Sequence, residues 1–245
     1  MNRLTEPKQT TALQEVASES DATPFKILIT TILSQRTKDK NTRKASDQLF
    51  LHYPDVESLA NADAKHVEKL IHPSGFYHMK AKSITSVAKI LLKKHGGIVP
   101  RDLKELLKLP SVGRKTANCV LTYGFRIAAI PVDTHVHRIA NRLAIVKTKT
   151  TEQTEFELRR SIEKRFWLDL NEEFVKFGQR VCRPIRPRCL VCLLGYCCNW
   201  YQSYRRGGEM LWSNDKIYGR LEVKSDVVAD QSVIAETPIT TNDFE

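Results

Sequence analysis

The chain has 245 residues, 41% of them hydrophobic, and a formal net charge of +11. This length is enough for one large domain or two small ones. No apolar run approaches the ~20 residues that span a bilayer, and the first residues lack the apolar core of a signal peptide. The sequence therefore argues against a membrane or secreted protein and predicts a cytoplasmic one without membrane contact.

The positive charge is concentrated in the first 208 residues, which carry +16, whereas the residues from Glu209 onward carry −5. A body this basic favours a polyanionic partner, of which nucleic acid is the commonest. A generic basic surface is the alternative, and charge alone says nothing about chemistry. The acidic segment at 204–245 lacks periodicity and is expected to form a disordered tail.

Nearly every patterned segment is predicted to be helical, and none shows the alternation of a strand. Thr23 and Pro24 form a good N-cap and first-turn pair. The apolar run that follows, to Leu33, is hydrophobic almost all round, as expected at the centre of a helical bundle. After a polar break at 34–39, further helices are predicted near 40–51, 56–61, 63–71, 80–94, 101–108, 114–123 and 134–144.

Two more helices are predicted after residue 150. Thr150 and Gln153 form a capping box for a helix that reaches about Phe166. Asn171 is expected to cap the next helix, which ends at Cys182.

A tight turn at 109–113, Leu-Pro-Ser-Val-Gly, joins two of these helices and leads into Arg114 and Lys115. A hairpin that feeds a helix N-terminus presents unpaired backbone N–H groups to an anion, and the two cations add attraction for a nucleic-acid phosphate. At ~100° per residue, Lys115 stands clear of the apolar face of its helix, on the side of Asn118, Cys119 and Thr122. Lys115 is therefore a candidate nucleophile, with a solvated surface lysine as the alternative.

The segment Ile-Pro-Val-Asp-Thr-His at 130–135 places Asp133 at a predicted helix start. As an N-cap, Asp133 or Thr134 contributes ~1 kcal/mol. A capping aspartate has a fixed direction, so the same carboxylate can also face a reaction centre.

Four of the six cysteines fall in one short stretch with the spacing C-x6-C-x2-C-x5-C. Thiolates this close can converge on one metal centre and close a loop that has little else to fold it. Clustered cysteines in a cytosolic chain are more often ligands than disulfides. Spacing alone leaves zinc, an iron–sulfur centre and disulfides open. The candidate ligands are Cys182, Cys189, Cys192 and Cys198.

Together these motifs resemble the helix-hairpin-helix DNA glycosylases, and within them the endonuclease III branch. The match comprises Leu-Pro-Ser-Val-Gly-Arg-Lys-Thr-Ala at 109–117, Pro-Val-Asp-Thr-His-Val at 131–136, Arg138, Asn-Arg-Leu at 141–143, and the four-cysteine loop. The resemblance implies an all-α fold of two helical domains with a DNA-binding cleft between them. A six-helix bundle is expected at 22–127, and an iron–sulfur cluster domain at 1–21 together with 128–203.

Carried over residue by residue, the resemblance makes Lys115 the nucleophile, Asp133 the catalytic carboxylate, and the four cysteines the ligands of one 4Fe-4S cluster, with zinc less favoured. It implies a base-excision repair glycosylase that flips out and removes oxidised or damaged pyrimidines through a lysine Schiff base. The enzyme then cleaves the abasic site by β-elimination. For this attack the pKa of Lys115 is expected to fall below ~10.4, with neighbouring Arg and Lys as the cause.

The resemblance also implies DNA contacts. A wedge that fills the gap left by the extruded base aligns with Arg36, with Gln35 one residue away as the alternative. Phe76 matches an apolar plug that stacks on the opposite strand. The loop between the first two cysteines is expected to meet phosphates through Arg183, Arg186 and Arg188. The other expected DNA contacts are Leu109, Val112, Gly113, Arg114 and His135.

Two positions depart from the pattern. Ser111 stands where the family's hairpin usually has a glycine, and a positive φ there would cost ~1 kcal/mol or more; Cys197 has no assignable role. The expected partner is double-stranded DNA with damaged bases or abasic sites, bound by a monomer associated with the nucleoid. The alternatives are a monofunctional adenine or thymine mismatch glycosylase, against which Lys115 argues, and a non-catalytic DNA-binding protein.

Overall fold

The computed structural model describes residues 11–205, so nearly all of the expected acidic tail at 204–245 lies outside the described residues. The described chain is all-α, as predicted, and contains no β-strand. No helix in this part is both long enough and apolar enough to cross a bilayer. The α-helices are α1 (Ala12–Ala17), α2 (Pro24–Ser34), α3 (Asp39–His52), α4 (Val56–Ala60), α5 (Ala64–Leu70), α6 (Tyr77–His95), α7 (Leu103–Leu106), α8 (Arg114–Cys119), α9 (Thr134–Arg142), α10 (Thr151–Ser161), α11 (Trp167–Arg180) and α12 (Asn199–Arg205). The shorter elements are the π-helical turn η1 (Val120–Gly124) and the 3-10 turns η2 (Lys164–Phe166) and η3 (Cys189–Val191).

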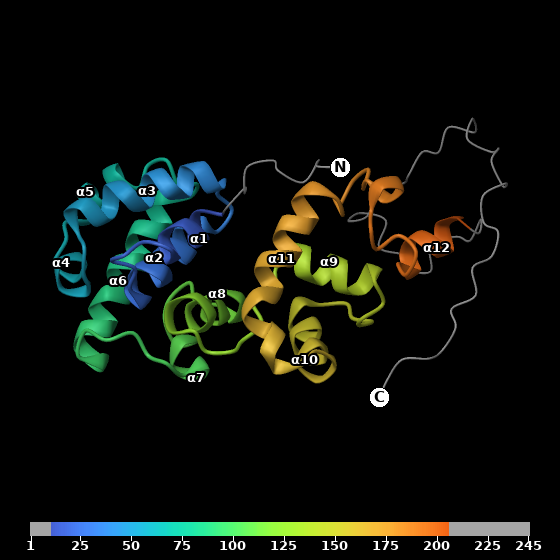
Figure 1. The fold of residues 1–245 in the computed structure, drawn as a ribbon. Coiled ribbons are helices and arrows are strands. Elements are labelled where there is room, and N and C mark those ends of the chain that lie inside the picture. Colours follow the sequence, from blue (N-terminus) through green and yellow to red (C-terminus); the bar gives the residue numbers. More distant parts are fainter. Residues whose placement is uncertain (1–10, 206–245) are drawn as a thin grey trace.

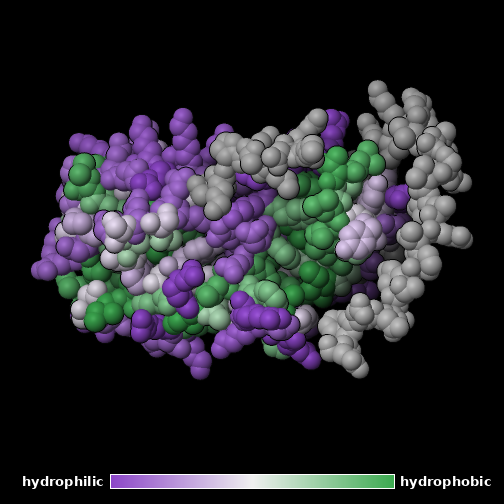
Figure 2. Space-filling view, viewed as in Figure 1, coloured by the Kyte–Doolittle hydropathy of each residue, from purple (hydrophilic) through white to green (hydrophobic). Residues whose placement is uncertain are grey.

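Figure 1 shows two groups of helices along the molecule, α1–α8 at one end and α9–α12 at the other. Each group has its own buried apolar cluster. The first extends from Phe25 to Ala129 and the second from Ile130 to Leu170. On the face in Figure 2, hydrophilic residues dominate over the first group, and hydrophobic residues gather over the second. The domain boundary at 127/128 stays a prediction, although the chain changes cores close to it.

Helix α2 lies at the centre of the first group because its sequence is apolar on every side. Thr23 caps it by accepting a hydrogen bond from Lys26 N (3.2 Å), and Pro24 occupies its first turn, as predicted. Every residue from Phe25 to Leu33 is buried, and the helix contacts α1, α3, α6, α8 and η1. Each large apolar side chain buried in this way contributes roughly 1.5–3 kcal/mol, so α2 anchors the elements around it.

The predicted capping box at Thr150 and Gln153 is present at the start of α10. The helix ends at Ser161, before the predicted Phe166, which lies in the short η2 turn instead. The prediction that Asn171 caps a helix is wrong.

Asn171 lies inside α11 and joins two other elements. Its Nδ2 donates to Pro131 O (2.8 Å), and its Oδ1 accepts from the Tyr123 hydroxyl (3.1 Å). A buried polar side chain needs such partners. Its local sequence resembles an N-cap signal, but its tertiary partners give it a different role.

The N-terminal helix packs on the first group of helices. Leu13 and Val16 of α1 form a small buried cluster with Ile27 of α2 and Cys119 of α8, and α1 contacts α2, α3 and η1. The expected division places 1–21 with the second group instead. Residues 1–10 of that range lie outside the described residues.

Candidate active site and cysteine-lined pocket

Lys115 lies in the first turn of α8, directly after the hairpin turn, and is half-buried. The sequence predicts that this side of the helix stands clear of the core. In the structure a neighbouring segment covers it. Asn118 Nδ2 donates to Ile130 O (3.2 Å), and Thr122 Oγ1 donates to Ala129 O (3.2 Å). The same segment leads into α9 and so brings the start of α9 to the start of α8.

Asp133 is the N-cap of α9, as predicted. Its Oδ1 accepts hydrogen bonds from His135 N (2.8 Å) and Val136 N (2.9 Å). Both capping bonds end on Oδ1, so Oδ2 is held in a fixed direction without taking part in them. An N-cap contributes ~1 kcal/mol to its helix, and here it also orients a carboxylate beside Lys115.

Three acidic groups act on the Lys115 amine: Cys119, Asp133 and Asp39. Its pKa is raised above the ordinary lysine value by Cys119 most strongly and also by Asp133, while desolvation opposes the rise. Burial also raises the pKa of the Cys119 thiol, against the opposing effect of the Lys115 amine. Asp133 and Asp39 add negative charge at the amine. The predicted lowering of the Lys115 pKa by neighbouring cations is therefore wrong, because the charges that reach Lys115 are negative.

The hairpin turn is strained at the position that the sequence indicates. Ser111 has a φ of 59°, in the left-handed region, which costs a residue with a side chain ~1 kcal/mol or more. Two contacts hold it there: Ser111 Oγ lies 2.8 Å from Ser83 Oγ, and Ser111 O accepts from Gln35 Nε2 (2.8 Å). These bonds offset part of the cost, so the turn keeps its shape without a glycine.

The other hairpin residues divide into a buried pair and an exposed end. Leu109 and Val112 are buried in the first core, so their side chains support the turn from beneath. Gly113 is exposed and is the N-cap of α8 without a side-chain hydrogen bond. The first N–H groups of a helix have no partner within it, so this end is suited to an anion.

Arg114 joins the hairpin to the second group of helices. Its Nε and Nη2 donate to the two carboxylate oxygens of Glu155 on α10, at 2.9 and 2.7 Å. Glu155 is 2% exposed and was not identified from the sequence. A signal was available, because Glu155 lies three residues before the buried Leu158 on the same helix face. An acid on a buried face needs a cationic partner.

Glu155→Gln is expected to lower the free energy of unfolding by about 1.5–3 kcal/mol, because it removes a charged, two-point hydrogen-bonded pair from a buried position. The control is Glu157→Gln on the same helix. Its contact with Arg160 (3.7 Å) is exposed, and such pairs contribute less than about 1 kcal/mol. Urea unfolding followed by circular dichroism measures both. Equal losses of unfolding free energy in the two variants would contradict a stabilising role for the Arg114–Glu155 pair.

The two wedge candidates lie differently. Gln35 Nε2 donates to Ser111 O and, at 3.3 Å, to Thr116 Oγ1, so its amide is engaged with the hairpin. Arg36 has a φ of 52°, and its guanidinium lies 5.8 Å from the centre of the Phe76 ring. Phe76 is 59% exposed. The structure therefore brings Arg36 and Phe76 together at the surface, and which residue forms the wedge stays a prediction.

His135 is held between α9 and α11. Its Nδ1 lies 2.9 Å from Arg138 Nη2, and burial lowers its pKa. The ring is therefore neutral at neutral pH and accepts from the guanidinium. A Cβ on Gly178 of α11 would lie 2.3 Å from the same ring nitrogen, so the close approach of the helices requires glycine. The predicted DNA contact of His135 stays a prediction.

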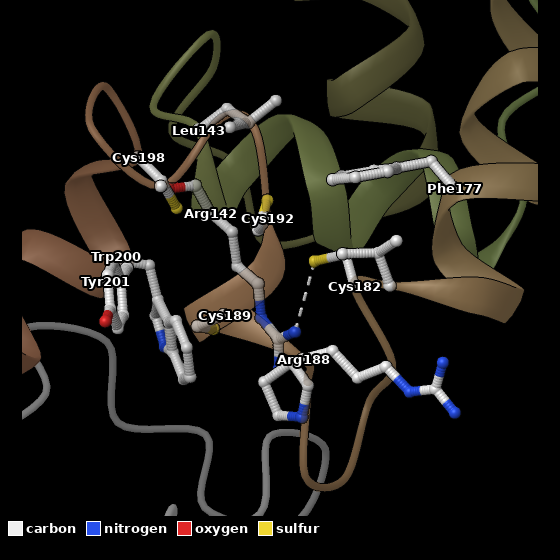
Figure 3. A pocket seen from close by; sticks show the side chains of 13 residues that line it. Arg142, Leu143, Phe177, Cys182, Arg188, Cys189, Cys192, Cys198, Trp200 and Tyr201 are labelled. Atoms are coloured by element: carbon white, nitrogen blue, oxygen red, sulfur yellow. Dashed lines mark hydrogen bonds between the residues drawn. The ribbon is translucent and has the colours of Figure 1, made fainter. Parts of the chain in front are cut away.

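The four cysteines of the spaced motif line one pocket (Figure 3). Burial, together with the nearby Cys182 and Cys198, raises the pKa of Cys189 to about 11. Four neighbouring thiols fit a thiolate-bound centre by their chemistry. The described His, Cys, Asp and Glu side chains nevertheless form no group already arranged to hold a metal ion. The other walls are mainly apolar or aromatic and include Leu143, Phe177, Val181, Trp200 and Tyr201.

Two buried arginines of α9 hold the loop at the first cysteine. Arg142 donates to Arg183 O (2.8 Å) and Pro184 O (3.1 Å), and its Nη1 lies 3.3 Å from Cys182 Sγ, the dashed line in Figure 3. Arg138 Nη2 donates to Cys182 O (2.8 Å). The sequence shows both arginines, but it does not show what they hold. Helix α9 therefore links the carboxylate at its start to the cysteine loop at its end.

The loop arginines Arg183, Arg186 and Arg188 are all exposed, and Figure 3 shows Arg188 pointing away from the pocket. Their charge is therefore available to a polyanion, although contact with DNA stays a prediction. Cys197 is exposed and lies outside this pocket. Its Sγ donates to Leu194 O (3.4 Å).

Comparisons with known proteins agree with this arrangement. Residues 29–164 match the family model described as HhH-GPD superfamily base excision DNA repair protein. The chain is 48% identical to Endonuclease III of Thermotoga maritima over 190 residues, which are 78% of this chain and 89% of the relative. It is 38% identical to Endonuclease III of Synechocystis, over 72% of this chain and 81% of the relative.

Solved structures lead to the same family. A non-covalent Endonuclease III–DNA complex matches with a TM-score of 0.71 and 32% identity, over 79% of this chain and 95% of that one. A thermostable thymine-DNA glycosylase matches with a TM-score of 0.70 and 26% identity, over 77% and 88%. With a family model matched over more than half of its length and relatives at this identity and coverage, the chain belongs to the HhH-GPD superfamily of base excision DNA repair proteins and, within it, to the endonuclease III family.

Proposed function

We propose that this chain is a base-excision DNA glycosylase and AP lyase that releases oxidised or damaged pyrimidines from double-stranded DNA and then cleaves the abasic site. The observation that supports this most directly is the position of Lys115 at the start of α8, where the charge of Asp133 acts on it. An amine and a carboxylate at one site supply the nucleophile and the proton acceptor that the reaction needs.

The first step is base release. C1′ of a damaged nucleotide is buried in the duplex, so the nucleotide must rotate out before Lys115 can reach it. Lys115 is protonated at rest because its pKa is raised, so it first loses a proton to the nearby carboxylate or to water. The neutral amine then forms a bond to C1′, and the glycosidic bond breaks with its electron pair leaving on the base. Asp133 stabilises the positive charge that develops at the sugar.

The second step is strand cleavage. Opening of the sugar ring gives an imine between Lys115 Nζ and C1′, and this cationic imine acidifies the hydrogen on C2′. A base removes that hydrogen, and the C3′–O bond breaks with its electron pair leaving on the 3′ phosphate. Water then releases Lys115 from the product. The same lysine therefore serves both steps, which a monofunctional glycosylase does not require.

The DNA would lie between the two groups of helices, α1–α8 and α9–α12. The exposed end of the hairpin at Gly113, the three loop arginines, and the Arg36–Phe76 pair would contact it. Phosphate contacts would set the position of the duplex, and the pair would fill the gap left by the extruded nucleotide. A single chain carries all of these parts, so we infer a monomer that works on the nucleoid in the cytoplasm.

The four cysteines would hold one 4Fe-4S cluster. In that position the cluster would supply a structural bond that closes the loop and holds Arg183, Arg186 and Arg188 in place. The chain's own support for this loop comes from Arg138 and Arg142, which bind its backbone.

The likeness to a thymine-DNA glycosylase favours a monofunctional mismatch glycosylase as the second candidate. Borohydride trapping separates the two functions. The chain is incubated with duplex DNA that carries one thymine glycol, and sodium borohydride is added. We expect a covalent adduct whose peptide mapping places the DNA on Lys115. Base release without an adduct, or activity confined to a thymine or adenine mismatch, would support the second candidate. Tight binding with neither reaction would support a non-catalytic DNA-binding protein.

Asp133→Asn is expected to slow base release by about 100-fold or more while leaving α9 intact. Asparagine caps a helix as well as aspartate does, but a neutral amide neither stabilises a cationic sugar nor accepts a proton. Single-turnover assays on the thymine glycol duplex measure the rate, and thermal unfolding serves as the control for folding. A rate within threefold of wild type would contradict a catalytic role for this carboxylate.

A further inference from the structure

Lys80 is a buried lysine that the proposed mechanism does not use. It lies in the first turn of α6 and is 6% exposed, and desolvation lowers its pKa to about 8. Its Nζ donates to Leu33 O (2.7 Å), Gln35 O (2.6 Å), Thr37 Oγ1 (2.9 Å) and Ser74 Oγ (2.9 Å). An ammonium has three N–H protons, so these four acceptors use all of them. None of the four is charged, and the bonds therefore serve to hold the backbone and hydroxyl groups that accept them.

The acceptors lie at two places: the last turn of α2 with the turn that follows it, and the turn before α6. The turns are also joined directly: Gly75 N donates to Thr37 Oγ1 (3.1 Å), and Ser74 Oγ donates to Leu33 O (3.0 Å). A Cβ on Gly75 would lie 3.0 Å from Arg36 O, so the two backbones are in close contact. Lys80 lies beneath this contact and bonds to both sides of it.

Each turn carries one residue in the left-handed region, Arg36 with a φ of 52° and Phe76 with a φ of 59°. Such a conformation costs ~1–2 kcal/mol for a residue with a side chain and persists only where the surroundings determine it. In that conformation the Arg36 guanidinium lies 5.8 Å from the Phe76 ring centre. The bonds from Lys80, together with the direct bonds between the turns, hold both turns in this conformation.

We propose that Lys80 is a positioning residue that locks the Arg36 turn to the Phe76 turn, so that the two side chains enter the duplex as one unit when a nucleotide is extruded. This inference rests on the proposed function. Extrusion costs a few kcal/mol, and a pair of side chains can offset that cost only if it keeps its spacing. Lys80 acts through the turns and touches neither the base nor the sugar.

Lys80→Met removes the bonds and keeps most of the side-chain volume. We expect single-turnover base release to slow by about 10–100-fold when thymine glycol is paired with adenine, because small misplacements cost this much. With thymine glycol in an unpaired bubble, where less extrusion is needed, we expect a loss of less than about threefold. Equal losses on the two substrates, or no loss on either, would overturn the proposal.

A binding assay separates this proposal from the proposed function. Duplex DNA with 2-aminopurine opposite a non-cleavable abasic analogue reports unstacking by fluorescence and needs no chemistry. Wild type is expected to raise the fluorescence on binding, and Lys80→Met to raise it by less than half as much at saturation. An equal rise in the two proteins would overturn the role of Lys80, whether or not wild type releases a base.

Two further variants complete the test. Lys94→Met changes an exposed lysine on the same helix and is expected to match wild type in both assays. Thr37→Val keeps Lys80 but removes the hydroxyl that accepts from Lys80 and Gly75. This variant tests the link between the two turns if Lys80→Met does not fold. We expect the same split between paired and unpaired substrates. A Thr37→Val protein that matches wild type on both would overturn the proposal.

Discussion

Lys115→Ala is expected to abolish both the borohydride-trapped adduct and the cleavage of abasic sites. Alanine has no nucleophile, and Lys115 is the one lysine of α8. The fold should persist, because Lys115 is half-buried and alanine is the best helix former. Gel analysis of the trapped products and of the cleaved strand measures both losses. The matched control is Lys104→Ala, an exposed lysine on α7, which should trap DNA like wild type.

A second test of Lys115 uses pH. Its pKa lies above the ordinary lysine value, so the lysine is charged at neutral pH. In the proposed mechanism only its neutral form attacks C1′. Below the pKa the neutral fraction rises about tenfold for each pH unit. The single-turnover rate of base release should therefore rise with pH between 6 and 8. A rate that falls over this pH range would show that another group limits the reaction. In the trapping experiment, an adduct formed by Lys115→Ala at the wild-type level would exclude Lys115 as the nucleophile.

Cys192→Ala is expected to prevent assembly of the proposed cluster and to weaken the salt-sensitive part of DNA binding. Three thiolates cannot complete a four-cysteine site, and metal binding in such loops is linked to their folding. If the cysteine loop is not closed, the loop arginines Arg183, Arg186 and Arg188 lose their fixed positions. Each phosphate contact contributes about 0.9 to the slope of log affinity against log salt, so the slope should decrease by about 2–3. Iron and sulfide analysis measures the cluster, and fluorescence anisotropy at several salt concentrations measures the slope.

The control for this prediction is Cys197→Ala. Cys197 is the neighbour of a candidate ligand, but it is exposed and lies outside the cysteine-lined pocket. Its replacement should leave the iron content and the salt slope unchanged. Loss of iron from both variants would assign Cys197 a ligand role. Wild-type protein that holds zinc in place of iron and sulfide would keep the four-cysteine site but exclude the 4Fe-4S cluster.

Features that depend on residues a few positions apart follow from the sequence. The Thr23 cap, the capping box at Thr150 and the N-cap at Asp133 are all present, because a cap is a contact between neighbours within one turn. The strain at Ser111 is expected from the family resemblance, because the family's hairpin usually has a glycine there, and the φ of Ser111 is indeed positive. The spacing of the four cysteines likewise needs no tertiary information.

The misassigned features depend on residues far apart in the chain. Asn171 resembles a cap but bonds to Pro131 and Tyr123. A helical wheel assigns Lys115 to the side of α8 away from the core, but it does not show that residues 129–133 cover this side. The direction of the Lys115 pKa depends on that cover, because it brings Asp133 close.

The sequence by itself determined the all-α class, the hairpin, the capping aspartate, the cysteine motif and, through them, the family. Only the tertiary structure decided that Arg114 pairs with Glu155, 41 residues away, and that Lys80 joins the turns at Leu33 and Ser74, 47 and 6 residues away. The physical reason is that caps and turns are local bonds with local signatures, whereas a buried charge takes whichever partner the packing of distant helices brings to it.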